Sequence, residues 1–199
     1  MAEILLFHHA HGLTDGLCDM ADRLRSAGHT VHAPDSYSGR TFDNLDDGIA
    51  FAESIGHDAL AHVAMRSTRM HRGANVALGF SMGTMQAQLI AQHARRIQGC
   101  VLMGGAMDPA QLGSAWRSQV PLQVHVADPD DWCTAEEVSA LHRCVPGADV
   151  FTYTGEQHMF VDPSLPDYDG DAADLFEERV LAWLTSVDAG TARPAPVAM

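Results

Sequence analysis

Short apolar runs recur along the chain, and stretches with helical spacing of apolar residues separate most of them. The runs have the length of buried strands. The first of them is Ile4-Leu5-Leu6-Phe7, and the second alternates in polarity before it stops at Pro34. We interpret these runs as strands at residues 4–7, 29–33, 75–78, 99–103, 122–126 and 150–153.

The intervening stretches carry helix signals. The first predicted helix has Asp15 as its N-cap, apolar positions such as Leu17 and Leu24, and Gly28 at its end. Another opens with the capping box formed by Thr134 and Glu137 and runs to about residue 144. A loop is predicted at residues 35–43, and further helices at residues 45–55, 58–70, 84–93 and 172–187. The last helix has apolar positions that suit packing on a sheet: Leu175, Val180, Leu181 and Leu184.

Strands that alternate with helices predict an α/β fold with a mostly parallel sheet and right-handed crossovers. A chain of 199 residues fits one domain, which we place at residues 1–187. At that length about 70% of the unfolded chain's surface can be buried, so the core needs no disulfide or metal. Residues 188–199 are rich in Ala, Pro and Gly and are predicted to be a mobile tail.

The composition narrows the classes of partner. The formal net charge is −14, which argues against nucleic acid and anionic membranes because both require clustered positive charge. All twelve basic residues are Arg, so chemistry that needs a Lys, such as Schiff-base formation, is excluded. We expect a small-molecule substrate and a monomer or small homo-oligomer.

The cysteines and the N-terminus indicate a cytoplasmic protein. Cys18, Cys100, Cys133 and Cys144 form no CxxC pair or dense framework, so we expect reduced thiols. The apolar run near the N-terminus is too short for a signal peptide or a membrane span, and Glu3 precedes it in place of a basic segment.

The segment Gly79-Phe80-Ser81-Met82-Gly83 is the strongest chemical signal. It is a G-x-S-x-G pattern between a predicted strand and a predicted helix, which is typical of a nucleophile elbow. The glycines allow the tight turn, and the exposed Ser81 hydroxyl then stands at a helix N-terminus. The backbone N–H of Met82 is placed to face a developing oxyanion. An ordinary glycine-rich turn with an idle serine is the alternative.

A serine nucleophile needs a base and an acid that orients the base, and in this architecture they follow in the order acid, then His. His158 lies in the loop after the last predicted strand and is the expected base. The acid is expected in the loop after the preceding strand, where Asp128, Asp130 and Asp131 remain alternatives because each can also form the turn.

The loop after the first strand, residues 8–12, should supply the second oxyanion N–H, and it is rich in histidine. His9 and His11 form an H-x-H pair, so a metal-dependent hydrolase is a rival hypothesis. Two observations argue against this hypothesis. The metal-dependent hydrolases that open with such a pair are barrels that usually exceed about 200 residues, and no second His pair with metal spacing follows in this chain. We favour a pocket-lining role for His9 and His11, with no metal and no cofactor.

An ordered set of motifs resembles the dienelactone hydrolase family of α/β-hydrolases over about residues 4–187. The set comprises residues 7–14, 33–35, 38–42, 79–83, 124–132 and 155–160. The resemblance implies a compact α/β-hydrolase fold with helices on both faces and no large cap. It also implies Ser81 as nucleophile, His158 as base, Asp130 as acid, and Met82 and Ala10 as the oxyanion donors.

The chain departs from the family's pattern at three positions. The namesake enzymes use Cys where this chain has Ser81, an acidic residue where it has His9, and an Arg where it has Asp162. An acid in place of that Arg would repel an anionic substrate, so the expected substrate is a neutral or weakly polar ester or lactone.

The sequence thus predicts a serine hydrolase of the dienelactone hydrolase type that cleaves a small carboxylic ester or lactone through an acyl-enzyme. Acyl transfer or thioester cleavage on the same residues and a non-catalytic ligand-binding domain are alternatives, as is the metal-dependent reading. Further candidates for substrate binding come from loops and from positions beside the expected site: Tyr37, Arg40, Trp132, Met159 and Phe160. Met82 and Trp116 are also candidates for the pocket wall, although each of these apolar residues could equally belong to the core.

Overall fold

The computed structural model describes residues 1–195, and its centre is a six-stranded sheet in which all neighbouring strands are parallel. The strand order is β2-β1-β3-β4-β5-β6. The strands are β1 (Glu3–Phe7), β2 (Thr30–His32), β3 (Val76–Phe80), β4 (Gly99–Met103), β5 (Leu122–Asp128) and β6 (Asp149–Thr154). The predicted parallel α/β fold is confirmed, and the predicted strands differ from the observed ones by at most two residues at an end.

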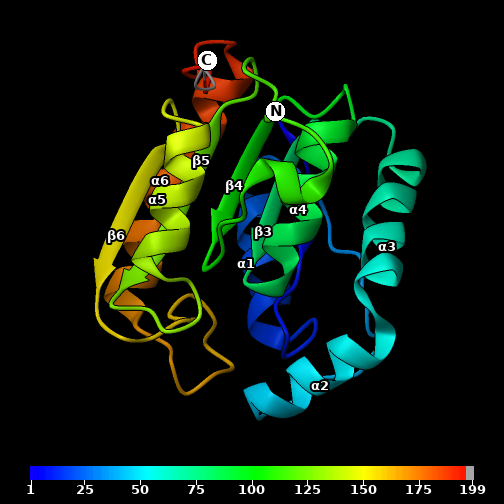
Figure 1. The fold of residues 1–199 in the computed structure, drawn as a ribbon, viewed down its shortest axis with the longest axis vertical. Coiled ribbons are helices and arrows are strands. Elements are labelled where there is room, and N and C mark those ends of the chain that lie inside the picture. Colours follow the sequence, from blue (N-terminus) through cyan, green and yellow to red (C-terminus); the bar gives the residue numbers. More distant parts are fainter. Residues whose placement is uncertain (196–199) are drawn as a thin grey trace.

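Helices cover both faces of the sheet (Figure 1). They are α1 (Asp15–Ser26), α2 (Leu45–Ile55), α3 (His57–Met70), α4 (Met82–His93), α5 (Ala135–Cys144) and α6 (Gly170–Asp188), with a 3-10 turn at Pro109–Leu112. One apolar core joins the sheet to α1 and α6, and a second joins the other face to α3, α4 and α5. In Figure 1, α2 lies across the end of the molecule toward which the strand arrows point.

Alternation along β1 explains how one strand serves both cores. Ile4 and Leu6 pack in the core under α1 and α6, whereas Leu5 and Phe7 pack in the core under α3 to α5. Successive side chains of a strand point to opposite faces, so a strand buried on both faces is apolar at every position.

Three helix predictions need correction. The N-cap of α1 is Thr14, whose side chain accepts a hydrogen bond from the Leu17 N–H, and Asp15 is the first helical residue. Helix α4 begins at Met82, two residues before the predicted start, because the turn at Ser81 leads directly into it. On α6, Val180 and Leu184 are buried and Leu181 packs against the core as predicted, but Leu175 is 40% exposed and Phe176 beside it is buried instead.

The chain end and the cysteines can be compared with their predictions. The Ala195 side chain is buried in the core under α3 to α5, and the predicted mobility of residues 188–199 stays a prediction. The predicted mobility of residues 196–199 concerns positions outside the described residues. All four cysteines are free thiols, as predicted. Within residues 1–195, no helix combines the length and apolar content that a membrane span requires.

Two buried histidines make the fold sensitive to acid. His125 on β5 is fully buried, with Nδ1 2.8 Å from the Tyr153 hydroxyl and Nε2 3.2 Å from Gln123 Oε1. Burial lowers its pKa to about 3. His8, after β1, donates from Nδ1 to the His9 carbonyl, and burial lowers its pKa to about 4. Both rings are therefore neutral in the native protein at pH 5.

We expect the free energy of unfolding to fall as the pH drops below about 6.5. The unfolded chain binds a proton on each histidine near that pH, whereas native His8 and His125 do not, so acid favours the unfolded state. At pH 5 the loss should be about 2 kcal/mol for each of the two residues. The difference between the free energies of unfolding in urea at pH 7.5 and at pH 5 measures this loss.

The variant His125→Gln should remove about 2 kcal/mol of this pH-dependent loss, because glutamine takes up no proton. His62→Gln, an exposed position on α3, is the matched control and should keep the full loss. A wild-type stability that does not change between pH 7.5 and pH 5 would contradict the expectation, whatever the variants do.

Candidate active site

Ser81 sits on a strained turn between β3 and α4. Its φ of 47° and ψ of −115° lie outside the regions that a residue with a side chain usually adopts. The turn fits because its flanks are glycine: a Cβ on Gly79 would overlap the Gly83 carbonyl, and one on Gly83 would overlap the Phe7 carbonyl. The Ser81 N–H donates to the Met103 carbonyl at 2.7 Å, which fixes the turn to β4.

The hydroxyl of Ser81 contacts His158, and His158 contacts Asp130. The distance from Ser81 Oγ to His158 Nε2 is 2.8 Å, and His158 Nδ1 lies 2.8 and 2.9 Å from the two carboxylate oxygens of Asp130. Because Nδ1 donates to the carboxylate, Nε2 is free to accept the Ser81 proton. The side chains of His158 and Asp130 are buried, so this chain of contacts is shielded from water.

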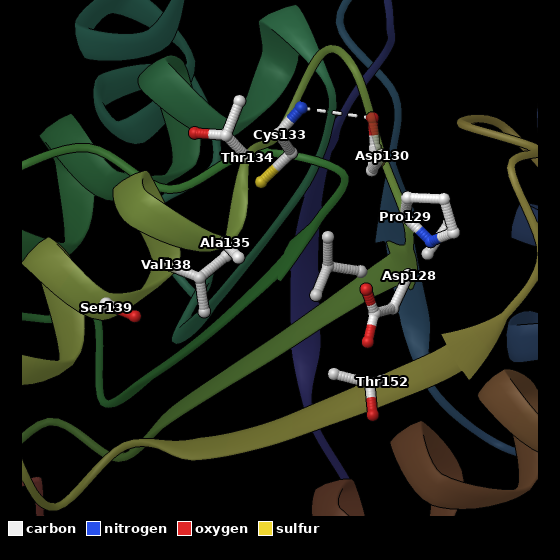
Figure 2. A pocket seen from close by; sticks show the side chains of 11 residues that line it. Asp128, Pro129, Asp130, Cys133, Thr134, Ala135, Val138, Ser139 and Thr152 are labelled. Carbon is white, nitrogen blue, oxygen red and sulfur yellow. Dashed lines mark hydrogen bonds between the residues drawn. The ribbon is translucent and has the colours of Figure 1, made fainter.

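The turn after β5 holds the Asp130 carboxylate in place. Asp130 Oδ1 accepts hydrogen bonds from the backbone N–H groups of Trp132 at 2.8 Å and Cys133 at 3.0 Å, the second of which is drawn in Figure 2. Asp128 and Asp131, the alternatives that the sequence left open, have exposed side chains. Of the three carboxylates, Asp130 is the one that meets the imidazole.

A cavity of about 310 Å³ lies behind this turn, between β5, β6 and α5 (Figure 2). Its walls include Val126, Cys133, Val138 and Thr152. Asp130 borders it, but neither Ser81 nor His158 does, so this cavity does not give access to the serine hydroxyl.

Two other cavities, each of about 240 Å³, meet at Ser81. They share Ser81, Met82, His57 and Trp132. The first, here called the apolar cavity, is completed mainly by aliphatic side chains: Ala10, Leu45, Ile49, Ala52 and Leu60. The second, here called the mixed cavity, adds polar and backbone groups to two methionines: Thr84, Met85, Gly104, Gly105, Met107 and Glu137.

The two positions expected to supply oxyanion donors border the same cavity as Ser81. Ala10 lies in the loop after β1, and Met82 is the first residue of α4. The Met82 N–H belongs to the first turn of the helix, where backbone donors have no partner within the helix. The α4 dipole adds partial positive charge at the same place.

His9 and Asp162 do not line either cavity beside Ser81; they contact each other. His9 Nε2 donates to Asp162 Oδ2 at 2.8 Å, and both side chains are fully buried. The same carboxylate accepts from the Thr14 hydroxyl at 2.5 Å and the Ser164 N–H at 2.8 Å. The predicted exposure of Asp162 to substrate is therefore wrong, since three donors occupy the carboxylate.

The charge states of this buried pair follow from its surroundings. Burial lowers the pKa of His9, which is therefore neutral. Burial alone would raise the pKa of Asp162, but the hydrogen bonds it accepts, foremost from His9, hold that pKa below its ordinary value. The pair ties the loop that carries Ala10 to the segment that follows His158.

The histidine loop does not gather metal ligands. His11 Nδ1 donates to the Phe42 carbonyl at 2.8 Å, and its ring packs edge-on against His9 at 5.3 Å between centroids. In residues 1–195, no three His, Cys, Asp or Glu side chains lie together in a way that could hold a metal ion.

Of the predicted substrate-binding and pocket-wall residues, Trp132 and Met82 line the cavities beside Ser81. Trp132 is 52% exposed, and its ring centroid lies 6.5 Å from that of His158. Arg40 stacks on the Phe51 ring, 4.9 Å from its centroid, rather than reaching the serine. The remaining candidates are buried core residues: Tyr37, Trp116, Met159 and Phe160.

Sequence reasoning missed the contribution of α2 and of His57. Leu45, Ile49 and Ala52 are spaced four and three residues apart on α2, a signal that was visible but is shared by ordinary core-facing helices. His57, the first residue of α3, borders both cavities, and no motif marks it.

Comparison with known protein families identifies the family to which the chain is similar. The sequence model of the dienelactone hydrolase family matches residues 1–187. No curated protein sequence matches the chain.

Solved structures with the same fold are distant in sequence. The dienelactone hydrolase-like promiscuous phosphotriesterase P91 from metagenomic libraries has a TM-score of 0.76 and 20% identity, covering 94% of this chain and 87% of its own. A candidate dienelactone hydrolase from Klebsiella pneumoniae subsp. pneumoniae MGH 78578 has a TM-score of 0.74 and 18% identity, covering 93% and 87%. The thioesterase domain from the curacin biosynthetic pathway has a TM-score of 0.62 and 12% identity, covering 90% of each chain.

At these identities the structural neighbours establish the fold, and the match over residues 1–187 establishes the family. The six-stranded parallel sheet agrees with the fold of these neighbours. The chain therefore belongs to the dienelactone hydrolase family of α/β-hydrolases.

Proposed function

We propose that the protein is a serine hydrolase that cleaves small, neutral carboxylic esters or lactones through an acyl-enzyme. One observation carries the proposal: Ser81 Oγ, the His158 imidazole and the Asp130 carboxylate form a continuous chain of contacts of 2.8 to 2.9 Å at the meeting point of two cavities. A serine with a base in contact, and a base with an orienting acid, is the arrangement that acyl transfer requires.

In the proposed reaction Ser81 Oγ attacks the carbonyl carbon of the ester while His158 Nε2 takes the hydroxyl proton. The Asp130 carboxylate stabilises the imidazolium that forms. The N–H groups of Ala10 and Met82 stabilise the negative charge on the carbonyl oxygen. His158 then gives its proton to the leaving alcohol, and the acyl group stays on Ser81.

The second half of the reaction repeats these steps with water. His158 takes a proton from the water as it attacks the acyl carbon, and the proton returns to Ser81 Oγ as the acid leaves. Attack by a second alcohol or a thiol in place of water would give acyl transfer on the same residues. No step calls for a metal or an organic cofactor.

Labelling with a fluorophosphonate and a panel of p-nitrophenyl esters and lactones tests the proposal. We expect one covalent adduct per chain on Ser81, found by mass spectrometry, and loss of ester hydrolysis in proportion to the labelling. Hydrolysis that survives complete labelling of Ser81, or that a chelator abolishes, would overturn the serine mechanism.

We further expect neutral esters to be better substrates than carboxylate-bearing esters of equal size. Glu53 borders the apolar cavity and Glu137 the mixed cavity, on a chain of net charge −14. The repulsion comes from these two residues, because Asp162 is fully buried and lines neither cavity. Glu53→Gln should raise kcat/KM for the anionic ester about two- to fivefold at low salt, and added salt should reduce the gain.

Glu178→Gln is the matched control for this charge change. Glu178 is exposed on α6, on the opposite face of the sheet from α3 to α5. The control should leave the ratio of the two kcat/KM values at its wild-type level. Equal gains from Glu53→Gln and Glu178→Gln would show that only overall charge, and no local repulsion, sets the preference.

A further inference from the structure

Helix α2 presents an aliphatic stripe to the space beside Ser81. Leu45, Ile49 and Ala52 lie one helical turn apart on one side of α2, and all three border the apolar cavity. Their side chains are half-buried, and Gly48 is the sole buried residue of the helix. Each therefore keeps apolar surface that the rest of the protein does not cover.

The position of α2 is fixed by close contacts on its inner side. A Cβ on Gly48 would overlap the Ala10 carbonyl, so the helix backbone rests directly on the loop that is expected to supply an oxyanion donor. The Tyr37 hydroxyl donates to the Gly48 carbonyl at 3.2 Å, and the Tyr37 ring packs edge-on against Phe51 at 4.9 Å. The stripe is thus a wall held at a set distance from the serine.

The two cavities at Ser81 differ in their relation to His158. The mixed cavity includes Gly104, and a Cβ on Gly104 would lie 3.0 Å from His158 Cε1, so one wall residue of this cavity packs close to the imidazole, as none of the residues found only in the apolar cavity is known to do. The leaving alcohol must be near His158 Nε2 to receive its proton. The leaving group therefore fits the mixed cavity, which leaves the apolar cavity for the acyl chain.

We propose, building on the serine-hydrolase function above, that α2 is the acyl-binding wall and that the substrates are esters of short aliphatic acids with small polar alcohols. The volume of about 240 Å³ lies below the roughly 300–1,000 Å³ of sites for drug-sized ligands, which sets a limit on the acid. Ala52 is the specificity-determining residue of this wall, because its small side chain leaves the space that a longer acyl chain fills.

Two alanines of α2 provide a matched test. Ala52 borders the cavity, whereas Ala50 on the same helix is exposed to solvent. Esters from acetate to octanoate with one common alcohol are compared by kcat/KM. In the wild type we expect about a fourfold gain for each added methylene until the cavity is full, and a fall beyond it.

Ala52→Leu should lower the butyrate-to-acetate ratio of kcat/KM at least tenfold, because the leucine takes the space of the distal methylenes. Ala50→Leu should leave the ratio at its wild-type value. Ile49→Ala enlarges the same cavity and should move the optimum to a longer acid, so the proposal remains testable if Ala52→Leu folds poorly. Urea midpoints identify any such variant.

Alkyl fluorophosphonates of increasing chain length separate this proposal from the function it rests on. If Ser81 reacts and the rate follows alkyl length in the wild type but not in Ala52→Leu, the proposal is supported. If Ser81 reacts with all lengths alike, or if Ala52→Leu and Ala50→Leu behave alike, the acyl wall is wrong and the serine mechanism stands. If no probe labels Ser81, the proposed function itself fails, and the acyl wall fails with it.

Discussion

Replacing Ser81 with alanine should lower kcat by several orders of magnitude. The hydroxyl oxygen forms the bond to the acyl carbon in the proposed reaction, and alanine has no atom that can take its place. His158 and the backbone donors would remain, so a small residual rate above that in water is expected from binding and oxyanion stabilisation alone.

The fold should survive this substitution. The turn at residue 81 is strained in φ and ψ, but serine and alanine share the same Cβ and have similar demands there. The one side-chain hydrogen bond lost is that from Ser81 Oγ to His158 Nε2. The urea midpoint of Ser81→Ala should therefore stay close to that of the wild type.

Ser118→Ala, at an exposed loop position, serves as the control and should retain the wild-type rate. Steady-state hydrolysis of a short-chain p-nitrophenyl ester gives kcat, and circular dichroism with urea unfolding checks the fold. Turnover near the wild-type value in a folded Ser81→Ala protein would remove the serine from the mechanism and leave a different nucleophile to be found.

The sequence predicted most of the fold because the signals involved are local. Strand β1 is apolar at every position from Ile4 to Phe7, and the capping box at Thr134 and Glu137 is present as predicted. Such patterns state which element forms, but they do not decide each position at the edge of a helix face. The pattern places Leu175 on the buried face of α6, whereas the structure buries its neighbour Phe176.

The candidate site was only partly predictable, for a different reason. Ser81 and His158 could be predicted because each follows a strand in a fixed chain order. Chain order leaves Asp128, Asp130 and Asp131 open, and the resemblance to the family points to Asp130. His9 and Asp162 are 153 residues apart, and nothing in either neighbourhood states that they meet. Two of the three departures from the family pattern, His9 and Asp162, form one buried pair in the structure.

The stripe on α2 shows the limit of periodicity most clearly. The spacing of Leu45, Ile49 and Ala52 predicts an apolar face, and that face exists. Whether protein or an open cavity covers such a face depends on elements elsewhere in the chain, here Ala10 and Trp132. The position of Tyr37 in a loop likewise predicts a role in substrate binding. In the structure its side chain is buried instead, and its hydroxyl donates to the Gly48 carbonyl of α2.

Asp130→Asn should lower kcat by about 10³–10⁴, the loss expected when the orienting acid of a serine triad becomes neutral. Lost stabilisation of the imidazolium is one cause. The hydrogen bonds around the carboxylate add a second, because Asp130 Oδ1 already accepts from the backbone N–H groups of Trp132 and Cys133. The amide oxygen of the variant would keep that place, which turns the amide NH₂ toward His158.

An NH₂ group facing His158 Nδ1 makes that nitrogen an acceptor, so the proton of the neutral ring moves to Nε2. His158 Nε2 then donates a hydrogen bond to Ser81 Oγ and can no longer accept the proton of the Ser81 hydroxyl. The rate of Ser81 labelling by a fluorophosphonate should fall along with kcat, since both need the same proton transfer. Asp128→Asn and Asp131→Asn, at exposed positions in the same turn, should lose far less. A large loss from Asp128→Asn with a small one from Asp130→Asn would assign the acid to Asp128.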